Sequence, residues 1–378
     1  MDQIAAALAR TPLHDLNARL GAKFAPFAGY ELPVQFPAGI LAEHAGAREG
    51  AALFDVSHMG QIVLRPRSGD VADAAKALER LVPQDIVGLG PDRQRYAFFT
   101  NAQGGILDDL MVARRADHLF LVVNASNAAA DAAHLEALTA DACRVEVLDR
   151  ALVALQGPQA EAVLAACGAD LSATRFMDAV DADVAGVPCR LTRSGYTGED
   201  GFEISVPREG AEAVAQALLD AGAQHAGLGA RDSLRLEAGL CLHGSDIDAG
   251  VTPVEAGLAW AIQKARRNGG ARQGGFPGAA RILQELAEGP RRLRVGLRAE
   301  GRAPMRAGTI LYSSEAAETP CGGVVSGGFG PTLGAPVAMA YLPAGLSAPG
   351  TQLWGDVRGK RLPAVVAPMP FVPHRYKR

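Results

Sequence analysis

The sequence has few cysteines and aromatic residues, and it lacks any long apolar run. Its five cysteines are widely spaced and form no CxxC pair, which argues against a zinc site or a thioredoxin-type centre. No segment approaches the ~20 consecutive apolar residues of a membrane-spanning helix. The start, MDQIAAALARTPL, has an apolar stretch of only six residues without a basic segment before it, so no signal peptide is expected. We therefore expect a cytoplasmic protein with free thiols.

Motifs of several enzyme classes are missing as well. The sequence contains no Walker A loop, no Rossmann fingerprint, no HExxH or HxxxH spacing and no GxSxG elbow. Asp55, Ser57 and His58 lie together in FDVSHMG, but the members of a catalytic triad converge from separate elements. The 37 basic and 41 acidic residues give a net charge of −4, which argues against nucleic-acid binding.

The chain of 378 residues is long enough for two or three domains. Alanine-rich segments with apolar residues at helical spacing predict helices at 70–82, 127–140, 157–168, 210–222 and 230–240. Short apolar or alternating segments predict strands at 60–66, 95–100, 106–114, 118–124, 143–149, 151–157, 188–194 and 202–207. Because no regular βαβ period links them, the pattern predicts an α+β fold.

A change in composition marks residues 264–280, KARRNGGARQGGFPGAA, which are basic and rich in glycine. We interpret this segment as a loop or linker. After it the sequence is almost purely strand and turn, which predicts a separate all-β domain from about residue 280 to the end.

Two adjacent aspartates lie inside an apolar run in TNAQGGILDDLMV, residues 100–112. The preceding strand RYAFF and the turn at 101–105 predict a hairpin. Because strand side chains alternate, Asp108 and Asp109 must point to opposite faces of the sheet. Either one carboxylate caps the turn and the other is solvated, or one points inward as an acid, a base or a stabiliser of a cation.

A loop punctuated by glycines, SGYTGEDGFEISVP, joins two predicted strands at 194–207. It is either an acidic hairpin turn or a loop that presents Tyr196 and Glu203 to a ligand with hydrogen-bond donors. The following helix at 230–240 carries Arg231, Arg235 and Glu237. It is either an ordinary helix with internal Arg–Glu pairs or one that directs an arginine at its end into a pocket.

Nine stretches, in order, resemble the glycine cleavage system T-protein family of aminomethyltransferases. The similarity extends from about Thr11 to Tyr376. The stretches are RTPLHDLNARLGAKFAPFAGYELPVQF, ALFDVSHMG, FFTNAQGGILDDLMV, VVNASN, LVALQGP, SGYTGEDGFEISVP, ARDSLRLEAGLCLHGSDID, TPVEAGLAWA and PFVPHRY.

The resemblance implies a three-domain cloverleaf around a central folate pocket. Domain 1, discontinuous and folate-binding, would comprise residues 1–57 and 146–279. Domain 2, a ferredoxin-like α+β unit, would comprise 58–145, and domain 3, β-barrel-like, 280–378. The family's co-substrate is tetrahydrofolate, and no metal is implied. Its donor is an aminomethyl group on the dihydrolipoyl arm of H protein, with the P and L proteins acting in the same system. The products are 5,10-methylenetetrahydrofolate, ammonia and dihydrolipoyl H protein, and no nucleic acid or membrane is implied as a partner.

The resemblance also assigns site residues. Asp109 matches the catalytic aspartate, which would orient the folate amine and stabilise an iminium-like species electrostatically. Asp108 would then be structural or solvated. Glu203 matches a residue that grips the pterin, Arg231 a residue that contacts folate, and Tyr376 a C-terminal tyrosine at the same ligand. Three further residues lie in segments that resemble the pocket lining: Tyr196, Met59 and Asn124. Trp260 could equally be a core residue or a pocket residue.

Two other functions stay open. Another tetrahydrofolate-dependent demethylase would share the folate pocket and differ in what approaches Asp109. A folate-binding assembly factor for iron–sulfur proteins would carry a KGCYxGQE motif, whereas the cysteines here lie elsewhere, in EAGLCLHG and VPCRLT. The segment 264–280 departs from the ordered helical stretch of many family members. We expect it to be a mobile, solvated loop, although Arg266 and Arg267 could meet the folate tail or an acidic carrier.

Overall fold

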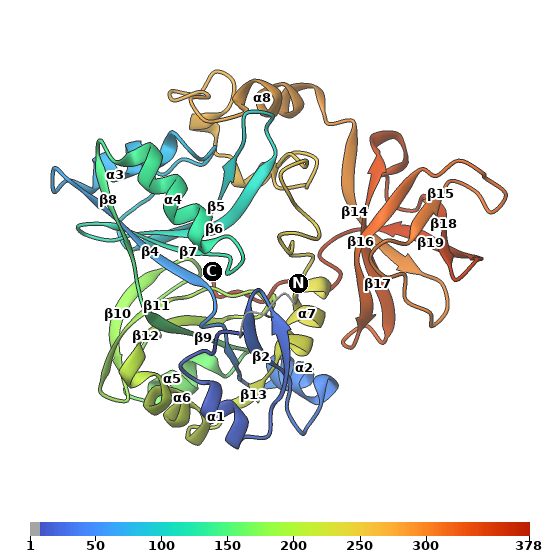
Figure 1. The fold of residues 1–378 in the computed structure, drawn as a ribbon. Coiled ribbons are helices and arrows are strands. Elements are labelled where there is room, and N and C mark those ends of the chain that lie inside the picture. The colour runs from blue at the N-terminus through green and yellow to red at the C-terminus, as the bar shows by residue number, and fades with distance from the viewer. Residues whose placement is uncertain (1–7) are drawn as a thin grey trace, which may run out of the picture.

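The computed structural model describes residues 8–378, and Figure 1 shows how they are arranged. Most of the short apolar stretch near the N-terminus therefore lies outside the described residues. Two units built on open sheets lie one above the other, and a closed barrel stands beside them. The predicted α+β class and the β-barrel-like C-terminal domain are confirmed.

A six-stranded sheet forms the lower unit in Figure 1. β13 pairs with β3 in parallel, and the other neighbouring strands are antiparallel. Three helices, α1 (His14–Arg19), α5 (Ala160–Ala166) and α6 (Ala211–Asp220), pack on one face over a buried core. In spatial order the strands are β10 (Ala179–Val184), β11 (Val187–Thr192), β12 (Gly201–Pro207), β9 (Arg150–Gln156), β3 (Ala52–Asp55) and β13 (Gln224–Ala226).

A five-stranded antiparallel sheet forms the upper unit. Two helices, α3 (Val71–Glu79) and α4 (Ala128–Thr139), cover its outer face. Without its edge strand β5, the order is that of a ferredoxin-like unit. In spatial order the strands are β5 (Arg93–Thr100), β6 (Ile106–Arg114), β7 (Leu119–Val123), β4 (Gly60–Pro66) and β8 (Cys143–Val147). The inner faces of the two sheets share one buried cluster that includes Phe54, Ala154, Val63 and Phe120.

The C-terminal unit is a closed six-stranded barrel with the order β14-β17-β16-β15-β18-β19. Its apolar interior includes Leu297, Leu311 and Leu353. The barrel packs on α7 (Leu228–Glu237), which also contacts α2 (Ile40–Glu49) and the hairpin of β1 (Lys23–Phe27) and β2 (Tyr30–Gln35). The barrel strands are β14 (Arg292–Ala299), β15 (Ile310–Tyr312), β16 (Gly322–Gly330), β17 (Ala335–Pro343), β18 (Gln352–Val357) and β19 (Lys360–Ala367).

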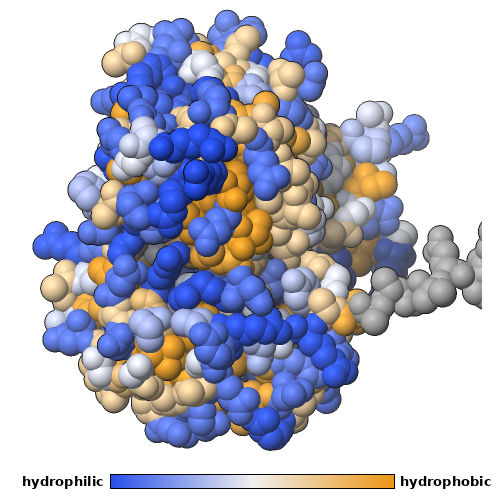
Figure 2. Space-filling view, turned by 60° about the vertical axis from the view of Figure 1, so that its left-hand side comes forward, coloured by the Kyte–Doolittle hydropathy of each residue, from blue (hydrophilic) through white to orange (hydrophobic). Residues whose placement is uncertain are grey.

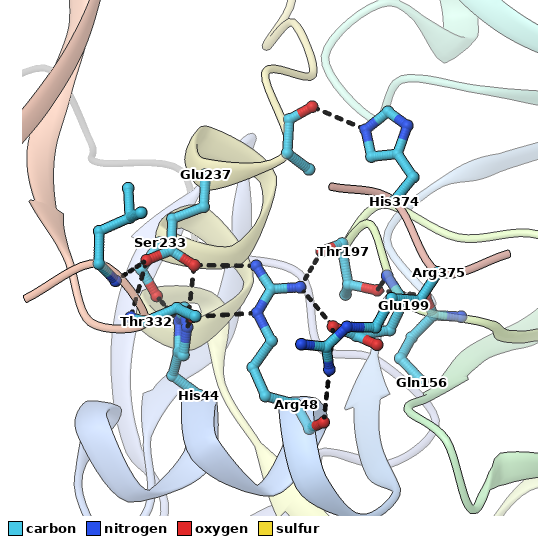
Figure 3. Close-up of polar contacts among 12 residues, drawn as sticks. His44, Arg48, Gln156, Thr197, Glu199, Ser233, Glu237, Thr332, His374 and Arg375 are labelled. Atoms are coloured by element: carbon cyan, nitrogen blue, oxygen red, sulfur yellow. Dashed lines mark hydrogen bonds and ion pairs between the residues drawn. The ribbon is translucent and has the colours of Figure 1, made fainter. Parts of the chain in front are cut away.

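A buried arginine joins these parts. Arg48 of α2 donates hydrogen bonds to Glu199 at 2.7 Å and to Glu237 of α7 at 2.9 Å. Its Nε donates to Thr332 Oγ1, in the loop between β16 and β17, at 3.1 Å. Figure 3 shows the guanidinium between the two carboxylates. One side chain thus connects α2, α7, the 194–200 loop and the barrel.

The same contacts show that the acidic residues of the 194–200 loop are paired rather than free turn residues. Glu199 is only 1% exposed and pairs with Arg48, and Asp200 pairs with Arg193. The sequence could not reveal the first pair, because 151 residues separate its members. The alternative of internal Arg–Glu pairs in α7 is also wrong: Glu237 pairs with Arg48, and Arg235 pairs with Asp232 and Asp246.

The C-terminal tail, residues 368–378, returns from the barrel across α7 to the six-stranded sheet. The backbone N–H groups of Phe371 and Val372 donate to Glu237, and that of Arg375 donates to Gly198 at 2.8 Å. Gly198 has a φ of +80°, and a Cβ atom there would lie 2.9 Å from the side chain of Ala238. A glycine therefore permits the close approach at this loop.

The segment 264–280 is packed, in contrast to the predicted solvated loop. Arg266 is 4% exposed and donates to the carbonyls of Glu79 and Val82, at the end of α3. Arg267 donates to the carbonyls of Ile262 and Ala259. Both guanidinium groups are engaged within the protein, so the alternative role at a folate tail or a carrier surface is not supported.

The helices and strands predicted before residue 264 all correspond to elements of the structure. The prediction of only strands and turns after 280 is wrong at its start, because α8 (Ala279–Glu288) precedes the barrel and buries Ile282 and Leu283. None of the helices within residues 8–378 is both long and apolar enough to cross a bilayer. Figure 2 shows a mostly hydrophilic face on which apolar residues gather mainly in one patch in the upper half.

We propose three domains close to the predicted ones: 1–57 with 148–279, 58–147, and 280–378. The pairing of β3 with β9 supports the discontinuous first domain, since it brings an early and a later segment into one sheet. β8 ends at Val147 in the five-stranded sheet, which moves the second boundary by two residues.

Candidate active site

Asp109 lies on the hairpin of β5 and β6. The two strands pair antiparallel, and the side chain of Asn101 caps the turn between them. Along β6, residues 106, 108 and 110 are buried, whereas 107, 109 and 111 are more accessible. The predicted hairpin and the opposite orientation of Asp108 and Asp109 are confirmed.

The Asp109 carboxylate is held by two donors. The hydroxyl group of Tyr96 donates to Oδ2 at 2.9 Å, and Asn124 Nδ2 donates to Oδ1 at 2.8 Å. Burial, together with the charge of Asp108, raises the pKa of Asp109 to about 6. The two hydrogen bonds oppose this rise, so the group is a partly buried carboxylate that ionises near neutral pH.

Asp108 lies on the covered face, so the expectation that it could be solvated is wrong. It is 0% exposed, because α4 packs over this side of the sheet. Its Oδ1 accepts hydrogen bonds from the side chains of Asn124 and Asn127, each at 2.8 Å. Asp108 is therefore enclosed by protein donors and does not face the same side as Asp109.

A cavity of about 310 Å³ lies beside the Tyr96 side chain that holds Asp109. Trp260 stacks on Tyr96 with ring centroids 5.8 Å apart, and Phe176 and Met177 also line this space. Trp260 is 64% exposed and therefore is not a core residue. The walls suit a flat, partly apolar ligand.

Tyr196, Arg231 and Glu203 form a second part of the same site. The Arg231 guanidinium lies 4.9 Å from the centroid of the Tyr196 ring. Burial raises the pKa of Glu203, and the positive charge of Arg231 opposes that rise. The charge of Asp109 also acts on Tyr196, whose hydroxyl group donates to the carbonyl of Cys241. The structure therefore brings together Asp109, Asn124, Tyr196, Arg231 and Glu203.

Polar groups in this part are left without protein partners. Arg231 Nη1 is buried and makes no hydrogen bond, although the guanidinium faces Glu203. Glu203 accepts one side-chain hydrogen bond, from Ser194 at 3.1 Å. A partly buried cation and a partly buried carboxylate, each with unused hydrogen-bonding capacity, suit a ligand that offers both acceptors and donors.

His58 is not part of a triad. Asp55 accepts hydrogen bonds from Thr11 and Asn17, and the Ser57 hydroxyl group donates to the carbonyl of Leu152. Burial, together with the charge of Arg231, lowers the pKa of His58 to about 3, so the imidazole is neutral. Its position beside Arg231 was not predicted.

Met59 and Tyr376 make apolar and aromatic contacts. Met59 is half-buried against the cluster between the two sheets. Tyr376 stacks face to face on Phe176, with ring centroids 4.0 Å apart. Because Phe176 lines the cavity, Tyr376 reaches this site through that ring rather than through Asp109.

Sequence reasoning missed Tyr96, Ser194 and Phe176 as site residues. Tyr96 carried a usable signal: in the predicted hairpin it alternates with Phe98, which pairs directly with Asp109, so both share the face of the carboxylate. Phe176 had no such signal in the sequence, because it reaches the cavity from a loop of the unit built on the six-stranded sheet. Across residues 8–378, no three His, Cys, Asp or Glu side chains gather as metal ligands.

Known proteins share this architecture and sequence. Residues 13–266 match the family described as the GCVT N-terminal domain, and residues 291–373 match the glycine cleavage T-protein C-terminal barrel domain. The chain is 46% identical to the mitochondrial aminomethyltransferase of Homo sapiens, covering 98% of this chain and 91% of that protein. It is 41% identical to the mitochondrial aminomethyltransferase of Dictyostelium discoideum, covering 98% of this chain and 94% of that protein.

A solved structure agrees. The glycine cleavage system aminomethyltransferase T from Bartonella henselae is similar with a TM-score of 0.91 at 44% identity, covering 98% of this chain and 100% of that one. The agreement extends over both open sheets and the barrel. These three parts are therefore arranged as in a known aminomethyltransferase.

The predicted cytoplasmic location is contradicted, because the human and Dictyostelium relatives are named as mitochondrial enzymes. All five cysteines are free, as predicted. Free thiols persist in any reducing compartment, however, so they could not distinguish one such compartment from another.

The family matches together span most of the chain, and identities of 41% and 46% hold over nearly its full length. Asp109, the cavity beside its partner Tyr96, and the neighbouring Arg231 and Glu203 lie within the matched N-terminal part. The chain belongs to the glycine cleavage T-protein family and is an aminomethyltransferase of the glycine cleavage system.

Proposed function

We propose that this aminomethyltransferase takes its one-carbon unit from an aminomethyl group on the dihydrolipoyl arm of H protein and passes it to tetrahydrofolate. The P and L proteins would act in the same system. The observation that carries the proposal is the Asp109 carboxylate, which is partly buried and held by Asn124 and by Tyr96, whose side chain lines a cavity. Relatives named as aminomethyltransferases support it.

Glu203 and Arg231 are the proposed anchors for the pterin. The amino-pyrimidinone edge of a pterin has adjacent N–H donors and a carbonyl acceptor, which match a carboxylate and a guanidinium. Support comes from the unpartnered Arg231 Nη1 and the single side-chain donor to Glu203. Tyr196 would offer a ring face, Met59 an apolar contact, and Tyr376 would support the outer wall through Phe176.

In the proposed reaction, the two folate nitrogens form bonds to the methylene carbon. The C–S bond to the arm and the C–N bond to the departing ammonia break. The protons lost by the folate nitrogens go to the thiolate and to ammonia. Positive charge develops at the carbon as these bonds exchange, and the Asp109 carboxylate would orient the amine and stabilise that charge in a site with little water.

The direct experiment uses H protein that carries the aminomethyl group. Ammonia and 5,10-methylenetetrahydrofolate are measured with and without tetrahydrofolate. We expect both products to form together, and fast release of ammonia only when tetrahydrofolate is present. Tight folate binding without product formation would instead favour a different one-carbon donor.

The rate should depend on pH through Asp109. Only the ionised carboxylate stabilises positive charge, and the pKa of this group is about 6. The rate at saturating substrate should therefore fall as the pH drops through about 6 and level off above it. Ammonia release measured from about pH 5 to about pH 8 checks this. A flat profile would contradict the role of Asp109.

Replacing Glu203 with glutamine should weaken folate binding about 10- to 100-fold, because a hydrogen bond to a charged group is worth about 1.5–3 kcal/mol. Isothermal titration with tetrahydrofolate measures the change. The matched control is Glu209→Gln, since Glu209 is an exposed glutamate just beyond the same strand. Equal affinities for the two variants would rule out Glu203 as an anchor.

A further inference from the structure

A second pair of carboxylates lies behind Asp109, and the proposed reaction does not use it. Asp108 of β6 is fully buried, and Asp131 of α4 is 5% exposed. The two side chains are within hydrogen-bonding reach of each other. Two buried carboxylates in contact cannot both be ionised without a large electrostatic cost, so one proton must lie between them.

The donors around the pair identify which member is ionised. Asp108 accepts three hydrogen bonds: from the backbone N–H of Asn124 at 3.1 Å, from Asn124 Nδ2 at 2.8 Å and from Asn127 Nδ2 at 2.8 Å. Asp131 Oδ2 is buried and receives no hydrogen bond. A carboxylate surrounded by donors carries charge, whereas a buried oxygen without a donor is satisfied when it carries a proton and donates it.

We propose that Asp131 is the protonated member, that it donates its proton to Asp108, and that this pair positions Asn124 and through it Asp109. The proposal rests on the proposed role of Asp109. Asn124 Nδ2 is the connecting group, because it lies 2.8 Å from Oδ1 of both Asp108 and Asp109. Asp108 and Asp131 are positioning residues, since both are buried on the side of the sheet that α4 covers, opposite Asp109.

The proton on Asp131 also limits the negative charge around Asp109. Burial, together with the hydrogen bond to Asp108, raises the pKa of Asp131 to about 9, which agrees with the donor geometry. If Asp131 were ionised at neutral pH, a third negative charge would make Asp109 harder to ionise. The groups that face Asp109 are otherwise Tyr96 of β5, Asp108 of β6, His243 and Cys241 of the loop after α7, and Tyr196.

The first test reads the proton directly and does not use the reaction. The protein is labelled with carbon-13 at the aspartate side-chain carboxyl, and its NMR spectrum is followed over pH. We expect one resonance with the shift of a protonated carboxyl group at neutral pH, and we expect Asp131→Asn to remove it. A wild-type spectrum in which every aspartate is ionised at neutral pH would overturn the proposal.

The second test compares two substitutions by the pH profile of folate-dependent ammonia release. The acid limb of this profile is the fall in rate towards low pH. Asp131→Asn keeps a donor to Asp108 and should leave the limb at the same pH. Asp131→Ala removes the donor, so Asn124 is held less firmly and its hydrogen bond to Asp109 weakens. Because that hydrogen bond lowers the pKa of Asp109, the midpoint of the limb should rise by about one pH unit. A lower rate with an unmoved limb in Asp131→Ala would mean a merely structural role and would overturn the positioning.

The two tests separate this inference from the proposed function. If wild-type protein released no ammonia from the aminomethylated carrier, the proposed function would fail, while the NMR result would still decide the state of Asp131. Thermal unfolding of each variant, measured alongside, shows that both variants are folded when their profiles are compared.

Discussion

Asp109→Asn should lower folate-dependent ammonia release by about a hundredfold to a thousandfold, the typical effect of removing one group that stabilises charge in a transition state. Asparagine has nearly the same shape, so Tyr96 and Asn124 would still enclose it, but its amide is neutral. The negative charge that faces the developing cation would be lost. The measurement is ammonia and methylenetetrahydrofolate formation from the aminomethylated carrier, with wild-type protein in parallel.

Folate binding separates this prediction from a general loss of structure. The proposed pterin anchors, Glu203 and Arg231, are unchanged in the variant, so its affinity for tetrahydrofolate should stay within a few-fold of wild type. Asp149→Asn is the matched control, because Asp149 is an aspartate whose side chain is 77% exposed. Full activity in Asp109→Asn would mean that the carboxylate has no part in the transfer, as in a folate-binding scaffold.

Arg48→Ala should destabilise the protein by about 3–5 kcal/mol, the usual cost of removing one partner of a buried ion pair. The reason is that Glu199 and Glu237, which are 1% and 0% exposed, would lose the cation between them. The connection to Thr332 of the barrel would be lost as well. Urea unfolding followed by tryptophan fluorescence measures the change, because Trp354 lies in the barrel and Trp260 beside the cavity.

Arg65→Ala is the control for this prediction. Arg65 and its partner Asp117 have side chains that are 41% and 63% exposed, and an exposed pair of this kind contributes at most about 1 kcal/mol. If both substitutions cost the same, the Arg48 cluster does not stabilise the assembly of the barrel with α2 and α7. A loss confined to Arg48→Ala would establish that it does.

Local sequence patterns were sufficient to predict much of the fold. The period of two along ILDDLMV predicted that the adjacent aspartates face opposite sides of a sheet, and the turn at 101–105 predicted the hairpin. Both properties depend on neighbours within a few residues, because strand geometry and turn chemistry are local. The family resemblance added Glu203 and Arg231, and the structure brings both to the site of Asp109.

Sequence reasoning did not predict the burial and pairing of charged groups whose partners are distant in the chain. In sequence, Glu199 and Asp200 are compatible with an acidic hairpin turn, and Arg266 is interpreted as part of a basic loop or linker. In the structure Glu199 pairs with Arg48, 151 residues away, and Arg266 bonds to the end of α3, 187 residues away. Neither segment contains a local pattern that indicates such a distant partner. The sequence alone therefore does not distinguish a buried charge from a solvated one.

The sequence by itself determined the family, the α+β class, the barrel-like C-terminal part and the opposite orientation of the two adjacent aspartates. Only the tertiary structure decided that the second aspartate is buried against α4, that Tyr96 and Asn124 hold Asp109, and that Arg48 joins the barrel to the rest. The reason is physical: the alternation of side chains follows from the local backbone. Burial, ion pairing and protonation depend on which distant segments the fold brings into contact.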